Sequence, residues 1–121
     1  MVPIPGPSSI FLALMGSGFS GQSFAFHGYL PIPPSERQKR IKQLEQDALR
    51  GQTQIFMETP YRNQTLFEEL VQVAKPDTWL CIGANLTAAD QLLRTQTVGT
   101  WRKHPPDLHK KPAIFLLGKM G

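Results

Sequence analysis

The chain has 121 residues, of which 40% are hydrophobic and 18% are charged, and its formal net charge at pH 7 is +4. This length suits one globular domain, and the apolar content excludes an intrinsically disordered chain. A single cysteine excludes an internal disulfide framework and favours a reducing compartment, so we expect a cytoplasmic protein. No apolar run approaches the roughly 18 residues of a membrane span, so no membrane partner is expected.

The opening segment has two interpretations, a ligand site or a rigid corner. Residues 2–9 (VPIPGPSS) contain three prolines, which favour an extended entry. Pro7 suits a first helical position, and the hydroxyl groups of Ser8 and Ser9 can accept hydrogen bonds from exposed amide groups there. Residues 10–15 then predict a helix that is apolar on all sides. A turn followed by a helix N-terminus presents amide groups to a ligand.

Strands and helices are predicted to alternate through the middle of the chain. The aromatic, alternating residues 23–30 predict a strand. A long helix follows, capped by Ser35 and extending to about Arg50. Residues 53–57 (TQIFM) then predict a short, buried strand.

A further helix is expected to start with Thr59 as its N-cap and Pro60 as its first residue, and to extend to about Ala74. Because no long helix separates the last strands, some of them should pair antiparallel. The sequence therefore predicts an α/β fold, a mixed five-stranded sheet with helices packed on it. The remaining predicted elements are strands over residues 78–84, 92–98 and 113–117 and a helical turn over residues 99–103.

The long predicted helix carries a cluster of positive charge. Arg37, Lys39, Arg40 and Lys42 lie within two turns. Two interpretations remain open. The cluster is either a solvated helix face or a patch that contacts RNA phosphates.

Among the other polar residues, Glu58 is the carboxylate of most interest, because it lies between a strand and a helix. Its alternative role is to interact with the helix dipole or to pair with Arg62. Cys81 lies in an apolar strand and is expected in the core. The three histidines have no Cys or carboxylate at ligand spacing, so no metal site is predicted.

Three segments of the chain resemble the tetrapyrrole (corrin and porphyrin) methylase superfamily. Residues 2–9 resemble the V-x-P-G-x-S/T-S/A signature at the start of that superfamily's second domain. Residues 58–62 (ETPYR) look like the E-S-P-H-R motif of one branch, the small-subunit ribosomal RNA 2′-O-ribose cytidine methyltransferases. Residues 26–31 (FHGYLP) resemble the F-x-G-F-L-P segment of the same branch. The likeness covers most of residues 2–75.

This resemblance implies a two-domain methylase that uses S-adenosylmethionine, bound in the cleft between two α/β domains. Residues 1–121 would form the C-terminal domain, without the N-terminal one. The ends of the chain also favour a fragment, because Met1 leads directly into a proline-rich segment and a buried helix. We therefore expect the isolated chain to fold but to show little or no methylase activity.

The resemblance also assigns roles to individual residues. Contacts with the cofactor would be mostly through backbone and apolar groups, which suits adenine recognition. No catalytic base is assigned. The implied cofactor-binding residues are Ser8, Ser9, Met57, Ala84, Pro112 and Ala113. The implied structural, substrate or RNA contacts are Arg37, Lys39, Arg40, Lys42, Glu58 and Arg62.

Three functions remain open at this point. The first is 2′-O-methylation of a ribose in small-subunit rRNA, and the second is methylation of a tetrapyrrole, a corrin or another small molecule. The third is a non-enzymatic module that binds RNA or protein. The branch has an R-E-L-T-K-like run where this chain has residues 83–88 (GANLTA), which leaves the substrate open. The expected partners are the substrate, the missing N-terminal domain and, because such methylases are commonly homodimers, a second copy.

Overall fold

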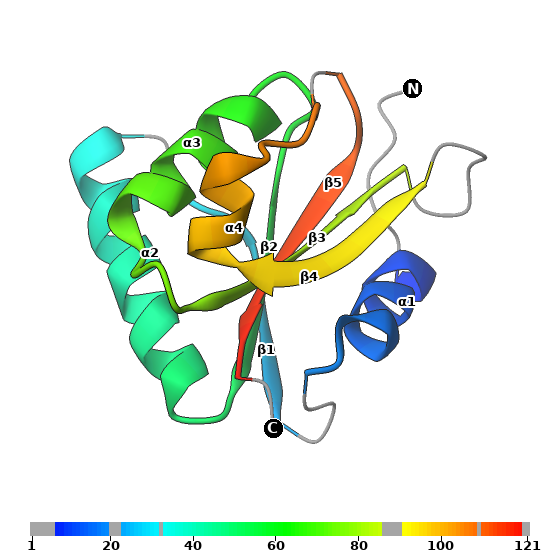
Figure 1. The fold of residues 1–121 in the computed structure, drawn as a ribbon, viewed down its shortest axis with the longest axis horizontal. Coiled ribbons are helices and arrows are strands. Elements are labelled where there is room, and N and C mark those ends of the chain that lie inside the picture. The colour runs from blue at the N-terminus through cyan, green and yellow to red at the C-terminus, as the bar shows by residue number, and fades with distance from the viewer. Residues whose placement is uncertain (1–6, 20–22, 32, 86–90, 109, 120–121) are drawn as a thin grey trace.

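A computed structural model describes residues 7–19, 23–31, 33–85, 91–108 and 110–119. Five strands form one mixed sheet with helices on both faces (Figure 1), as the sequence predicted. Within these segments, no helix has the length and apolar character needed to cross a membrane. In chain order the elements are α1 (Pro7–Ser17), β1 (Phe24–Tyr29), α2 (Pro34–Leu49), β2 (Thr53–Glu58), α3 (Asn63–Val73), β3 (Trp79–Ala84), β4 (Leu92–Thr97), α4 (Val98–Lys103) and β5 (Ala113–Gly118).

The strand order in the sheet is β1-β2-β5-β3-β4. The pair β1 and β2 is parallel, because α2 carries the chain back between them. The other three pairs are antiparallel. The last of the described strands, β5, therefore lies at the centre of the sheet, between β2 and β3.

The two faces of the sheet are covered differently (Figure 1). Helices α2, α3 and α4 lie on one face and α1 lies on the other. Neighbouring residues of a strand point to opposite faces. Thus Phe56 joins the large core under α2, α3 and α4, where its ring stacks on that of Phe115 at 5.9 Å between centroids. Ile55 and Cys81 join a smaller apolar cluster under α1.

The strand β1 lies beyond the reach of α1. Register places Phe26 beside Ile55, so Phe26 lies on the α1 face. However, α1 packs on β3, β4 and β5. Phe26 is 46% exposed as a result, and Phe24 and Tyr29 are exposed on the same strand. A shift of register at Gly28, whose φ is +67°, interrupts the pairing between β1 and β2.

Two predicted helix starts are wrong. Thr59 and Pro60 do not begin α3, which starts at Asn63 with Arg62 as its N-cap. These residues form a turn instead, in which the Thr59 amide donates to Oε1 of Glu58 at 2.8 Å and the Pro60 carbonyl accepts from the Lys110 amide at 3.1 Å. Ser35 does not cap α2 either. The helix already begins at Pro34, where the fixed φ of proline suits the first turn, and no side chain caps it.

Candidate active site

One edge of the sheet collects most of the predicted cofactor residues. Met57 lies at the end of β2, Ala84 ends β3, and Ala113 begins β5. Because β5 is antiparallel to both neighbours, its first residue lies beside their last ones. Ala113 pairs with Glu58 on one side and with Ala84 on the other, and Pro112 directly precedes it. The structure therefore places these predicted residues in neighbouring positions.

The residues at this edge divide between the two faces of the sheet. Met57 shares the α1 face with Ile55, whereas Ala84 and Ala113 belong to the large core on the other face. All three side chains are buried. Ser8 and Ser9 lie in the first turn of α1, and that end of the helix points toward the same sheet edge (Figure 1). Their hydroxyl groups lie outside the described side chains.

A buried ionic network supports the turn after β2. Oε2 of Glu58 lies 3.3 Å from NH1 of Arg37, and Nε of Arg37 lies 3.0 Å from Oε2 of Glu69. The side chains of Arg37 and Glu58 are only 3% exposed. The expected pairing of Glu58 with Arg62 is therefore wrong, since its partner is Arg37 from α2. This network joins the end of β2 to α2 and α3.

The predicted basic cluster on α2 is divided by the fold. Arg37 is buried, so neither a solvated face nor a phosphate patch describes it. Arg40 donates from NH2 to Nδ1 of His27 at 2.9 Å. Because arginine only donates, Nδ1 of His27 accepts, and Nε2 donates to Oε1 of Gln54 at 2.5 Å. Of the cluster, Lys39 and Lys42 extend into solvent.

Glu58 and Arg62 line a small pocket beside this network. Its volume is about 280 Å³, and the other lining residues are Tyr29, Leu30 and Thr59. The pocket brings the segments 26–31 and 58–62, both singled out from the sequence, to one place. It lies next to the edge that carries Met57, because Tyr29 pairs with Met57.

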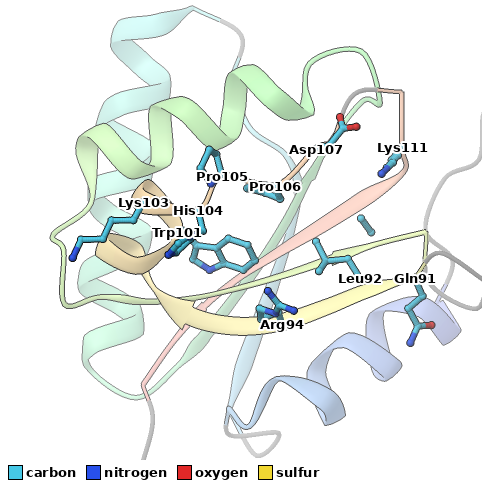
Figure 2. A pocket seen from close by; sticks show the side chains of 11 residues that line it. Gln91, Leu92, Arg94, Trp101, Lys103, His104, Pro105, Pro106, Asp107 and Lys111 are labelled. Carbon is cyan, nitrogen blue, oxygen red and sulfur yellow. The ribbon is translucent and has the colours of Figure 1, made fainter.

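A larger pocket of about 650 Å³ lies between β4, α4 and the residues that follow α4 (Figure 2). Sequence reasoning missed it, although basic residues on both sides of two consecutive prolines were a signal. Its cationic side chains come from Arg94, Lys103 and Lys111. The lining residues are Ala84, Gln91, Leu92, Arg94, Trp101, Lys103, His104, Pro105, Pro106, Asp107 and Lys111.

Hydrogen bonds from the start of α3 hold the wall of this pocket. Oε1 of Gln64 accepts from the Leu108 amide at 3.0 Å, and Nε2 of Gln64 donates to the Pro106 carbonyl at 3.2 Å. The buried side chain of Asn63 donates to the carbonyl of Lys111. Pro106, Leu108 and Lys111 are therefore tied to α3.

The thiol of Cys81 is buried in the small core cluster under α1. Burial raises the pKa of the Cys81 thiol to about 11, although a hydrogen bond with Thr95 opposes this. Cys81 is thus a protonated core residue at neutral pH, as expected. Among the residues that the structure describes, no group of three or more His, Cys, Asp or Glu is placed to hold a metal ion.

Comparison with known proteins identifies relatives of the chain. No protein-family model matches it. A protein from Mesorhizobium japonicum, named ribosomal RNA small subunit methyltransferase I, is 33% identical over 104 residues, which are 86% of this chain and 34% of that protein. Proteins of the same name from Vibrio cholerae and Escherichia coli O157:H7 are 28% and 25% identical over 120 residues, or 97% of this chain.

A solved structure shares the fold. The methyltransferase CobJ matches 91% of this chain and 47% of its own length with a TM-score of 0.60, at 15% identity. The chain is thus similar along most of its length to proteins named ribosomal RNA small subunit methyltransferase I, and it shares the fold of CobJ. It spans between about a third and two fifths of the length of these curated relatives.

Proposed function

We propose that this chain is the C-terminal domain of an S-adenosylmethionine-dependent methyltransferase that methylates a ribose 2′-hydroxyl of small-subunit rRNA. The observation that carries the proposal is the likeness to rRNA methyltransferases, which extends over 86% to 97% of the chain. The greater length of these relatives supports a second domain, which we place before this one.

The residues at the sheet edge fit the cofactor's adenosine. The side chains of Ala84 and Ala113 lie in the large core, so these two residues would meet the adenosine through their backbone groups at the strand ends. The thioether of Met57 is a polarisable apolar group suited to contact with an aromatic ring. Backbone turns at the edge add polar groups, since Asn85 has a φ of +50° directly after β3. We assign adenosine binding to Met57, Ala84, Pro112 and Ala113, and a contact at the first turn of α1 to Ser8 and Ser9.

Methyl transfer makes modest demands on these residues. The cofactor supplies a methyl group already activated by a positively charged sulfur, so the protein mainly orients the two reactants and excludes water. Glu58 is paired with Arg37, and Cys81 is protonated, so neither acts as a base here. We assign Glu58 a structural role, in which it fixes the turn that leads to Arg62.

Calorimetry with the full-length gene product tests the proposal. S-adenosylhomocysteine should bind, and labelled S-adenosylmethionine should transfer its methyl group to a ribose of unmodified small ribosomal subunits. Absence of both binding and transfer would refute the proposal. Transfer to a corrin or porphyrin, but not to the subunits, would keep the methyltransferase and refute the RNA substrate.

A matched pair of variants tests the cofactor edge. Met57→Ala should weaken S-adenosylhomocysteine binding about 10-fold, the loss expected for an apolar contact worth about 1.4 kcal/mol. Ile55→Ala truncates a buried side chain on the same strand and the same face, two residues further from the edge. It should change the affinity less than about 3-fold. Equal effects of the two variants would remove Met57 from the site.

A further inference from the structure

The larger pocket carries a second proposal, which rests on the RNA methyltransferase function proposed above. We propose that this basic groove, lined by Arg94, Lys103, His104 and Lys111, binds the phosphodiester backbone of the RNA substrate. The groove opens between β4, α4 and the segment 104–108 (Figure 2).

The groove is continuous with the candidate cofactor edge. Ala84 lines the groove and also lies at that edge, beside Ala113. Lys111, another lining residue, directly precedes the predicted cofactor residue Pro112. A strand of RNA that lies in the groove would therefore pass the place where the methyl group is delivered. The volume of about 650 Å³ leaves room for a nucleotide rather than for a single ion.

The cationic side chains of the groove are available to a ligand. Within the described segments no carboxylate lies in ion-pair contact with Arg94, Lys103 or Lys111. Among the described lining residues, Asp107 is the one carboxylate beside three Arg and Lys side chains, so this lining has a net positive charge. On α2, by contrast, Arg37 is buried against two carboxylates and Arg40 is bonded to His27. Phosphates are held by such uncommitted Arg and Lys side chains.

The floor and walls of the groove are fixed before any ligand binds. Nε1 of Trp101 donates to the Leu80 carbonyl at 2.8 Å, and its ring meets that of Phe67 edge-on at 6.3 Å between centroids. Gln64 holds the opposite wall through its two hydrogen bonds with the 106–108 segment. A preformed wall loses little conformational freedom on binding, which favours a specific contact over an incidental one.

Two variants with equal charge loss test the groove in the full-length protein. The groove variant is Arg94→Gln/Lys103→Gln/Lys111→Gln. The matched control, Arg50→Gln/Lys75→Gln/Lys119→Gln, removes three exposed cations that lie outside the groove and outside the predicted RNA contacts. The measurement is the affinity for a fluorescein-labelled 12-nucleotide single-stranded RNA, taken by anisotropy over a series of salt concentrations.

The groove variant should bind the RNA about 10- to 50-fold more weakly at low salt. It should also lower the slope of log K against log salt by about 2, because each lost phosphate contact on a single strand removes about 0.7. The control should change the slope by less than about 0.5. Equal losses in both variants, or no loss in the groove variant, would overturn the proposal.

Two further measurements separate this proposal from its alternatives. The groove variant should bind S-adenosylhomocysteine as the wild type does. If the wild type does not bind S-adenosylhomocysteine, the proposed function is refuted. If the groove variant binds S-adenosylhomocysteine and keeps the RNA affinity of the wild type, only the groove proposal is refuted. Cytidine 5′-monophosphate at 1 mM should leave the RNA bound. Complete displacement would indicate a site for free nucleotides and would overturn an RNA-backbone site.

Discussion

The two faces of the sheet are built from different interactions. Under α2, α3 and α4, buried polar groups join one element to another, as in the pairing of Arg37 with Glu58 and the contacts of Gln64 with the 106–108 segment. Under α1, the contacts are mostly apolar, with Cys81 and Ile114 in a small cluster. Directional contacts fix relative positions, whereas apolar packing mainly adds stability. The polar face is accordingly the one that carries both pockets.

Removal of Arg37 should have the largest effect. Arg37→Ala leaves Glu58 and Glu69 without their buried partner, so the free energy of unfolding should fall by about 3–5 kcal/mol. Urea unfolding measures this change. The control Arg50→Ala truncates a side chain that is 77% exposed and 3.9 Å from Asp47, so it should cost less than about 0.5 kcal/mol. A loss below about 1 kcal/mol for Arg37→Ala would show that the ionic network is not a strong tie.

On the α1 face, the thiol of Cys81 predicts a pH effect. The unfolded chain ionises this thiol near pH 9, but the folded chain does so only near its raised pKa of about 11. Between these values the folded state holds more protons, so stability should fall as the pH rises, by about 2–3 kcal/mol at pH 11. The variant Cys81→Ala should lack this part of the pH dependence of stability. Urea unfolding of both proteins at pH 8, 9.5 and 11 measures the difference. Parallel pH curves for both proteins would contradict the prediction.

Gln64 tests whether the polar ties of the large core hold the groove wall. Gln64→Ala removes two hydrogen bonds to the 106–108 segment and should cost about 1–2 kcal/mol. Amide hydrogen exchange at Leu108 should accelerate more than exchange at Leu80. Gln72→Ala, an exposed change on the same helix, should affect neither amide. Unchanged exchange at Leu108 would mean that the wall is held by packing alone.

The smallest effect on stability is expected for a substitution at Phe26, where α1 does not cover its face of the sheet. Phe26→Thr replaces an exposed aromatic side chain by another strand-forming residue, so the free energy of unfolding should change by less than about 1 kcal/mol. Urea unfolding is again the measurement. A loss above about 2 kcal/mol in the full-length protein would show that this part of the face is covered there, and would reduce the contrast between the two faces.

Much of the fold follows from local patterns in the sequence. The apolar runs gave the strands, and the glycine and proline residues bounded the helices to within a few positions. The start of α3 was missed because Glu58 and the loop before β5 hold the turn. For example, the Lys110 amide donates to the Pro60 carbonyl at 3.1 Å. Such contacts join residues about 50 positions apart, and no local propensity encodes them.

The part of the site that consists of motif residues could be predicted from the sequence. The part that depends on which side chains are buried could not. Residues of the two motif segments do meet at one small pocket. The burial of Arg37 was partly predictable, because Arg37 lies four residues before Ile41 and seven before Leu44, on the apolar stripe of α2. The groove could not be predicted from the sequence, because Arg94 and Lys111 come together only through the pairing of β4, β3 and β5.

The central place of β5 has a consequence for the order of folding. This strand follows the other four in the sequence, yet it joins β2 to β3. Until residues 113–118 have left the ribosome, the nascent chain can form only two separate strand pairs, β1 with β2 and β3 with β4. The two strand pairs then have no common hydrophobic core. Cooperative folding therefore requires β5 and depends on long-range contacts, which form slowly.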